Sequence, residues 1–362
     1  MIRSVKIACL FAVASMPPLG GQTPGMPKLR HAFTTTDIDL SPINRLTPIA
    51  VGPQGHVLFV SSAGSSALRM ALVDSTGKLV RRLGQTGGGP GEVGEPQPVE
   101  VGKDRVSVWD RANAVFLEWD LKGTLLQSVK PTRLSGVSFV SAEVVGMTKV
   151  ARGWQVVALN RTTGQLRELI PTADTFITAH FGLLSGAQES RYAPVPGVWS
   201  QGFVVADAGN YAVALYRWDG SLVRVLHREL APTHASAGRI DDFFATMNRQ
   251  AAARGQPPMD EVRMAMMRKQ GLEQVLPAIT PGGAIRVDSR DRMWVLGMEG
   301  DSAFADVFAS DRFLGRLPIP CRLYNGFWGL SGAWLAVACL PDDRKFDGDA
   351  IIKLFRITEG GR

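Results

Sequence analysis

Long apolar segments are absent from this chain of 362 residues, and motifs that carry chemistry are scarce. No apolar run reaches the ~18 residues of a membrane-spanning helix, so we expect no membrane span. The five histidines lack metal-ligand spacing and no Gly-x-Ser-x-Gly elbow occurs, so neither a metal centre nor a serine hydrolase is indicated. The 40 basic and 33 acidic residues are dispersed, which argues against nucleic-acid binding.

Cysteine is scarce too, with three in the chain. Cys321 and Cys339 are the two that would remain after removal of an N-terminal leader. In an oxidising compartment a disulfide between them would contribute about 3 kcal/mol by closing a short loop. Two buried free thiols in neighbouring strands explain the pair equally well. With no histidine nearby, the pair indicates neither a metal site nor a nucleophile.

The N-terminus has the pattern of an export signal. Arg3 and Lys6 precede an apolar stretch over residues 7–15, and Pro17–Pro18 would stop a helix there. We predict a signal peptide over residues 1–21. Cleavage within the apolar stretch and a buried N-terminal helix are the alternatives. The pattern predicts a periplasmic or secreted protein without a lipid anchor.

Short runs of β-forming residues recur along the chain, each followed by a polar turn that contains glycine. The turn glycines are Gly77, Gly123, Gly164, Gly220, Gly315 and Gly360. A glycine that can take positive φ between two such runs is a hairpin signal. The underlying period is about 45–50 residues, with four short strands in each unit, which is typical of a β-propeller.

We therefore predict an all-β fold for residues 22–362: a single six-bladed β-propeller with a helical insertion over 234–276, between blades 4 and 5. Within the insertion, one face of a helix is predicted to carry Ile240, Phe243, Phe244, Met247 and Ala251. The stripe predicts a helix that packs on the blades, and the methionines of the insertion would also suit an adaptable binding surface.

The last unit lacks a fourth strand, because the chain ends soon after its third, 349–357. Residues 28–40 contain a period-two alternation that includes Leu29, His31 and Phe33. We predict that 28–40 pairs with 349–357, which would close the ring and remove an exposed sheet edge.

Residues 99–123 resemble an NHL-type propeller repeat, which carries V-x-D-x-x-N-x-R followed by a strand and D-x-x-G. They contain Val-Trp-Asp-Arg-Ala-Asn and then Trp-Asp-Leu-Lys-Gly, and residues 202–220 are a second match. The stretch 87–92 is similar to the G-x-G-P-G-E-F segment of exported bacterial six-bladed propellers. Val115 and Val213 stand where the repeat has arginine, so the resemblance implies the fold rather than RNA or protein recognition.

Strand parity separates the two faces of such a ring. Blade-to-blade connections and second-to-third turns emerge on one face, which would therefore carry the long connections 85–96, 171–193 and 341–348 as well as the 234–276 insertion. Long irregular connections on a rigid scaffold are common binding sites. We expect the partner, a small molecule or a protein of unknown identity, on that face.

Four charged residues are candidates for binding. Glu100 and Arg286 occupy matching positions in the innermost strands of two units, near the central channel, where a charge needs a partner or water. Asp110 and Asp207 each end a second strand on the favoured face, where a carboxylate often caps its own turn instead.

These features favour an exported, non-catalytic ligand- or protein-binding propeller that needs no cofactor. The alternative is an enzyme at the channel mouth, either a calcium-dependent lactonase or esterase or a lyase, a group that some exported six-bladed propellers resemble. A Ca²⁺ site would need several inward Asn, Asp or Glu oxygens from different blades. Glu100, Asp110 and Asp207 are the candidates for such ligands.

Overall fold

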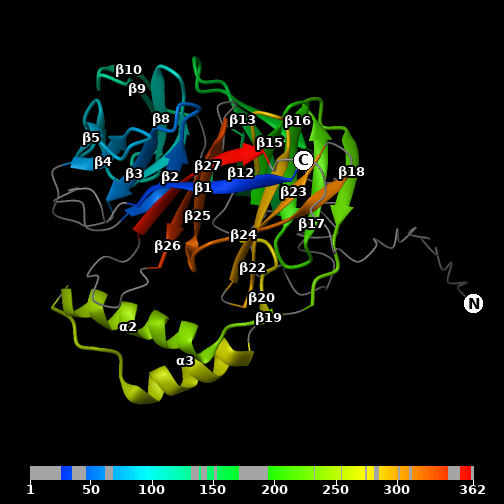
Figure 1. The fold of residues 1–362 in the computed structure, drawn as a ribbon. Helices are drawn as coiled ribbons and strands as arrows, with labels where there is room; N and C mark the ends of the chain where they lie inside the picture. The colour runs from blue at the N-terminus through cyan, green and yellow to red at the C-terminus, as the bar shows by residue number, and fades with distance from the viewer. Residues whose placement is uncertain are drawn as a thin grey trace, which may run out of the picture.

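Antiparallel β-sheets form the body of the protein in a computed structural model (Figure 1). The structure describes residues 26–34, 46–61, 68–131, 138–139, 145–150, 153–170, 195–231, 233–253, 255–273, 275–280, 285–300, 302–309, 312–340 and 351–359. Within these ranges five sheets have four strands and one has five. A separate two-stranded sheet, β19 (Thr233–His234) with β20 (Val275–Leu276), flanks two helices.

We number the six larger sheets in chain order. Sheet 1 contains β2 (Leu46–Val51), β3 (Val57–Ser61), β4 (Leu68–Val73), β5 (Leu79–Thr86) and β6 (Glu92–Val93). Sheets 2 and 3 contain β7 (Pro96–Val101), β8 (Arg105–Asp110), β9 (Val115–Asp120) and β10 (Leu125–Val129), then β11 (Ser138–Phe139), β12 (Val145–Val150), β13 (Gly153–Leu159) and β14 (Leu166–Ile170).

The remaining sheets follow the same pattern. Sheets 4 and 5 contain β15 (Val195–Trp199), β16 (Gly202–Asp207), β17 (Ala212–Arg217) and β18 (Leu222–His227), then β21 (Arg286–Val287), β22 (Met293–Glu299), β23 (Ser302–Phe308) and β24 (Phe313–Ile319). Sheet 6 contains β25 (Leu323–Ser331), β26 (Trp334–Cys339), β27 (Ile351–Glu359) and β1 (Pro27–Thr34).

The sheets stand face to face around an axis, so the fold is a β-propeller (Figure 1). The inner strands β15, β21, β25, β2 and β7 contact one another in that order, and β12, the second strand of sheet 3, contacts β15. Buried apolar clusters join each sheet to the next, and one of them joins sheet 6 to sheet 1. Because each sheet is packed on both faces, middle strands such as β8 and β16 are almost entirely buried, whereas the outer strand β18 is largely exposed.

Sheet 1 departs from the predicted four strands. After β5 the chain turns back and β6 pairs with it in parallel. Gly91 has a φ of 76°, and Glu92 Oε2 accepts a hydrogen bond of 2.8 Å from Gly89 N. Val93 is fully buried against Gly84, where a Cβ would lie 2.8 Å from a Val93 methyl group. The expectation of six uniform four-stranded blades is therefore wrong, since five have that pattern.

β1 lies along β27 at the outer edge of sheet 6. The pairing is antiparallel and runs from Pro27 opposite Glu359 to Thr34 opposite Lys353. Phe33 is buried among side chains of sheets 6 and 1. Residues 35–40 of the predicted 28–40 strand lie outside the described residues. β27 continues to Glu359, so the turn that the sequence predicted at its end is wrong, because the strand pairs with β1 over this length.

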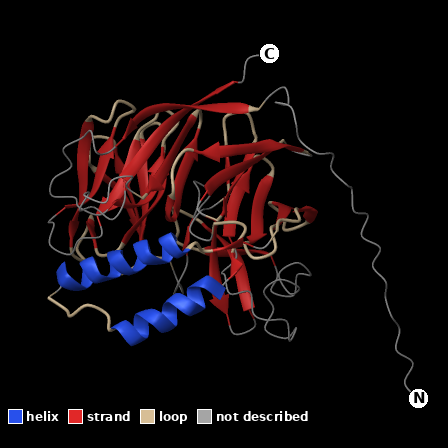
Figure 2. Ribbon diagram, turned by 60° about the horizontal axis from the view of Figure 1, so that its bottom comes forward, coloured by secondary structure: helices blue, strands red, loops and turns tan. Residues whose placement is uncertain are grey.

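Two helices, α2 (Ala237–Ala253) and α3 (Glu261–Glu273), lie between sheets 4 and 5 in the chain, side by side at one end of the body (Figure 2). Ile240 and Phe244 are buried, whereas Phe243 and Met247 on the same predicted stripe are 49% and 37% exposed. α3 continues through Gly271. The absence of a side chain there lets α3 lie close to α2, since a Cβ on Gly271 would be 3.1 Å from Ile240 Cδ1. No helix among the described residues is long and apolar enough to cross a membrane.

A buried polar cluster joins sheets 4 and 5 through Asp306. The Asp306 carboxylate accepts hydrogen bonds from Tyr211 Oη at 2.6 Å, from Arg316 Nε at 2.9 Å and from Arg228. The two guanidinium groups also lie over the rings of Phe313 and Phe304, at 4.1 and 3.5 Å from the centroids. Burial, and then the neighbouring carboxylate, raise the pKa of Tyr211 well above its usual value, so the phenol remains a hydrogen-bond donor.

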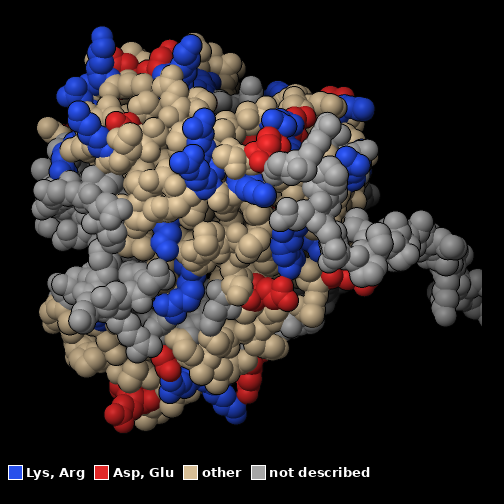
Figure 3. All heavy atoms as spheres, in the orientation of Figure 1, with Lys and Arg blue, Asp and Glu red and all other residues tan. Residues whose placement is uncertain are grey.

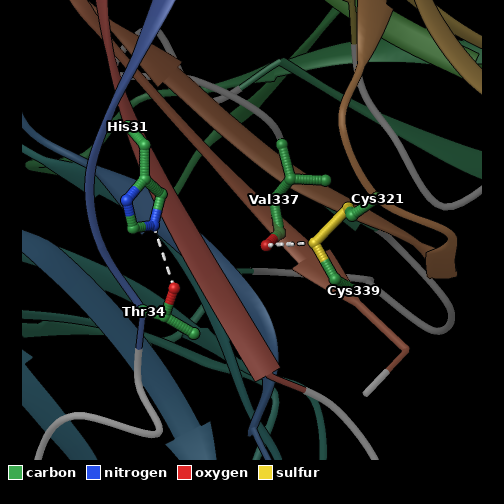
Figure 4. Close-up of a disulfide and its surroundings, with 5 residues drawn as sticks. All are labelled: His31, Thr34, Cys321, Val337 and Cys339. Carbon is green, nitrogen blue, oxygen red and sulfur yellow. Dashed lines mark hydrogen bonds between the residues drawn. A yellow bond between two sulfur atoms is a disulfide. The ribbon is translucent and has the colours of Figure 1, made fainter. Parts of the chain in front are cut away.

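Cys321 and Cys339 form a disulfide, with Cα atoms 5.7 Å apart (Figure 4). It connects the segment before β25 to the end of β26, beside the buried cluster between sheets 5 and 6. Figure 4 also shows β1 nearby, where His31 Nε2 lies 2.9 Å from Thr34 Oγ1. The pair is therefore a cross-link of sheet 6, in agreement with the first of the two sequence alternatives.

We expect the double variant Cys321→Ala/Cys339→Ala to lose about 3 kcal/mol of unfolding free energy, because the loop between the cysteines is released in the unfolded chain. Urea unfolding of the purified variant measures the loss. Reduced wild-type protein is the matched control and should show a similar loss. Equal stability of oxidised and reduced wild type would contradict the prediction.

Candidate functional site

A cavity of about 470 Å³ lies where the inner strands of five sheets converge. Its wall comes from the ends of β2, β7, β15, β21 and β25 and from the turns that follow β15 and β21. Small and branched apolar residues line most of it, among them Ala50, Val99 and Val198. The charged residues at its surface are Glu100, Arg286, Asp288 and Asp291.

The cavity opens at the end of the inner strands where each turns into the second strand of its sheet. The tight turns at Gly52–Gly55 and Asp288–Asp291 mark this end. The helices join the end of β18 to the start of β21, so antiparallel geometry puts them on the opposite face.

The described cavity therefore lies away from the face on which we expected binding. That expectation followed from loop length, whereas the cavity lies at the opposite end of the inner strands, where five of them converge. The long connections 171–193 and 341–348 lie outside the described residues.

Glu100, on β7, is held at the cavity wall by Arg161. Arg161 Nη2 donates to Glu100 Oε2 at 3.0 Å, and Arg161 Nη1 donates to Glu118 Oε1 at 2.8 Å. Ser107 Oγ donates to the same Glu118 oxygen at 2.9 Å. The sequence placed Glu100 near the channel correctly, but it gave no sign of Arg161, which comes from the turn between β13 and β14 in sheet 3.

Arg286, on β21, contributes the cation of the cavity. Burial lowers its pKa to about 10, because the guanidinium group loses water where protein atoms surround it. The side chain stays protonated at neutral pH. The structure thus brings Arg286 and Glu100 to one cavity, as their matching positions in two inner strands suggested.

Asp288 and Asp291 were not among the sequence candidates. The Asp288 carboxylate accepts hydrogen bonds from Arg290 N, Arg292 N, Arg292 Nε and Trp294 Nε1, at 2.7–3.1 Å. A carboxylate has about four acceptor positions, so Asp288 is fully used within its own turn. Asp291 accepts from Ser200 Oγ at 2.5 Å, across from sheet 5 to sheet 4. The sequence feature that could have indicated both residues is a pair of aspartates in the turn that follows an inner strand.

Asp110 and Asp207 do not reach the cavity. Each ends a second strand and is fully buried. Asp110 accepts four hydrogen bonds, from Gly94 N, Glu95 N, Ala112 N and Asn113 Nδ2. Asp207 accepts from Gly209 N, Asn210 N and Asn210 Nδ2. Their geometry is that of carboxylates that cap turns.

No group of three His, Cys, Asp or Glu residues within the described ranges is placed to hold a metal ion. Among the lining carboxylates, Glu100 pairs with Arg161 and Asp288 pairs with Arg292. Among the described residues the cavity therefore offers an apolar wall with one half-buried cation, Arg286, and carboxylates that accept hydrogen bonds from other side chains.

Comparison with known proteins identifies the fold and no more. No family model and no curated protein matches the chain, so the resemblance to NHL repeats stays a prediction. Among solved structures, a member of the duf4221 family from Bacteroides vulgatus covers 94% of this chain and 100% of its own, at 9% identity and a TM-score of 0.54. The likeness is one of fold.

Two further structures are less similar. A streptogramin B lyase covers 88% of this chain and 81% of its own, at 10% identity and a TM-score of 0.42. Regucalcin from Agrobacterium tumefaciens, described as a calcium-binding protein, covers 95% and 98% at 9% identity and a TM-score of 0.44.

Proposed function

We propose that this protein is an exported, non-catalytic propeller of six blades that binds a ligand in the cavity between its inner strands. The observation that carries the proposal is the 470 Å³ cavity, whose charged side chains Glu100 and Arg286 come from separate sheets. Ligand pockets typically measure about 300–1,000 Å³ and combine apolar walls with few polar groups.

Six blades follow if sheet 1 counts as a blade in spite of its fifth strand. Six apolar clusters, each between two neighbouring sheets, support that count. In the same interpretation β1 closes the ring, since it supplies the outer strand of sheet 6 from the other end of the chain. Export is supported by the pattern of residues 1–21, which lie outside the described residues.

Binding rather than catalysis is favoured by the state of the cavity carboxylates. A general base must be free to accept a proton from a substrate. Asp288 has its acceptor positions filled by its own turn, and Glu100 is paired with Arg161. Figure 3 shows Lys and Arg dispersed among neutral and acidic residues on the face in view, which gives no basic patch for a nucleic acid there.

Metal analysis of the purified chain separates this proposal from the calcium-dependent enzyme. We expect no stoichiometric divalent ion and a melting temperature that a chelator leaves unchanged. A native mass spectrum after incubation with a metabolite extract should show one added small molecule, and Val287→Phe, which fills the cavity, should remove it. A tightly bound calcium ion whose loss lowers the melting temperature would overturn the proposal in favour of the enzyme.

A further inference from the structure

The methionines of the helical insertion take no part in the cavity between the inner strands. Residues 234–276 contain five of the twelve methionines in the chain, namely Met247, Met259, Met264, Met266 and Met267. None of the five lines the cavity. They lie on and between α2 and α3, which run side by side at one end of the body (Figure 2). The insertion therefore concentrates thioether groups that the proposed function does not use.

Two contacts define how α3 packs on α2. At one end a Cβ on Gly271 would lie 3.1 Å from Ile240 Cδ1. Two turns further along, Asn248 Nδ2 donates to Met264 Sδ at 3.8 Å. The residue numbers rise on α2 while they fall on α3, so the two helices are antiparallel. The Asn248 side chain also accepts a hydrogen bond from Met259 N at 3.1 Å, which holds the segment before α3 against α2.

Met264 and Met267 share the face of α3 that packs on α2. Together with Gly271 they occupy positions i, i+3 and i+7, which fall on one stripe of a helix. Side chains three positions apart have Cβ atoms about 5–6 Å from each other. Met266 lies outside this stripe and is 55% exposed. Two thioether side chains on neighbouring turns are therefore directed from α3 toward α2.

Met247 supplies a third thioether from α2. It follows Ile240 and Phe244 at positions i, i+4 and i+7, on the stripe that faces α3. Its neighbour Asn248 contacts Met264 Sδ, so Met247 lies at the same level of the helix pair as Met264. Met247 is 37% exposed, and no residue of α3 is fully buried. An ion from solvent can therefore reach this group of side chains.

The chemistry of these three ligands is selective. A thioether sulfur is soft, polarizable and uncharged, and soft sulfur ligands favour Cu⁺, whereas Ca²⁺ and Mg²⁺ require oxygen ligands. Sulfur has two lone pairs, so Met264 Sδ can accept from Asn248 and still bind a metal ion. The cysteines of the described residues do not compete as thiolates, because Cys321 and Cys339 form a disulfide.

We propose that Met247, Met264 and Met267 form a binding site for one soft monovalent metal ion of the class of Cu⁺. Helix packing brings the three side chains together before the ion arrives, which lowers the entropic cost of binding. The flexible methionine side chains then adjust to the geometry of the ion. This site is separate from the cavity, so the inference does not depend on the proposed function.

The test uses Ag⁺ as the first probe, because it is a soft monovalent ion that needs no reductant and leaves the disulfide intact. Isothermal titration in a chloride-free buffer uses the mature chain, which lacks the predicted signal peptide and its Cys9. We expect one Ag⁺ per chain. Cu⁺, supplied anaerobically with ascorbate, should bind with the same stoichiometry and compete with Ag⁺. Zn²⁺ is the control ion and should bind at least about tenfold more weakly.

Variants then locate the ion. Met264→Leu/Met267→Leu should weaken Ag⁺ binding at least about tenfold, because two of the three sulfur atoms are lost. Leucine keeps the apolar volume, so the melting temperature should change little. Met266→Leu removes an exposed thioether from the same helix outside the site, and this matched control should retain the wild-type affinity.

Methyl NMR of the wild type provides a measurement that needs no stable variant. Ag⁺ should shift the methionine methyl signals of Met247, Met264 and Met267 and leave that of Met70, which is buried in sheet 1, unchanged. Absence of stoichiometric Ag⁺ binding would overturn the inference and show that the methionines only pack the helices together. Equal affinity in the double variant and the wild type, an equal loss in Met266→Leu, or Zn²⁺ binding as tight as that of Ag⁺ would overturn it as well.

Discussion

Deletion of residues 27–34 is expected to lower the melting temperature by about 10 °C or more, or to cause aggregation. The deletion removes β1, uncovers the apolar side chains that pack against Phe33 and exposes the edge of β27. Loss of a buried phenylalanine alone costs about 3–5 kcal/mol, and a free strand edge pairs readily with other chains. Differential scanning calorimetry and light scattering measure the two results.

A substitution on the same strand provides the control. Arg30 is exposed, so Arg30→Ser should shift the melting temperature by little, whereas Phe33→Ala should reproduce a large part of the deletion. Melting of the deletion variant at the wild-type temperature would mean that β1 contributes nothing to closure. The ring would then be held by the contact between sheets 6 and 1 alone.

The Asp306→Ala variant is expected to lose about 3–5 kcal/mol of unfolding free energy, because it removes the shared acceptor of the buried Tyr211 phenol and of two partly buried guanidinium groups. Asp306 is fully buried and is the shared acceptor of Arg228, Arg316 and Tyr211. In the variant, two guanidinium groups and a phenol between sheets 4 and 5 lose the carboxylate that accepts their hydrogen bonds. Urea unfolding of the variant gives the change.

Glu299 offers a matched control, since it also pairs with Arg316, at 2.9 Å, but is 64% exposed. Exposed ion pairs contribute about 0–1 kcal/mol, so Glu299→Ala should have a small effect. If both variants lose the same small amount, the cluster around Asp306 does not hold the two sheets together.

The repeat could be predicted where local chemistry decides the backbone. Gly77, Gly123, Gly164 and Gly220 have φ between 72° and 91° and sit in tight turns, as the sequence indicated. The turn predicted at Gly315 is wrong, because Gly315 lies inside β24, beyond the hydrogen bond from Ala309 N to Arg312 O that precedes the strand. A pattern of turn residues thus predicts the hairpin but not its register, which packing between sheets determines.

The site was predictable only in part. Glu100 and Arg286 were found because the inner strands of all blades converge on the axis, which is a property of the fold. Arg161 was not found, since it reaches Glu100 across 61 residues of sequence. The binding face was chosen from loop length, yet a cavity depends on which side chains are small, and single-sequence patterns carry little information about volume.

The pairing of β1 with β27 also has a temporal consequence. Lys28 and Thr358, which approach each other in this pair, are separated by 330 residues. At typical synthesis rates the ribosome needs roughly 15–70 s to add those residues. β1 therefore has no partner strand until β27 has been made. Its exposed residues are Lys28, Arg30, His31 and Ala32. Three of these four side chains are polar, which suits a strand that stays in water until β27 has been synthesised.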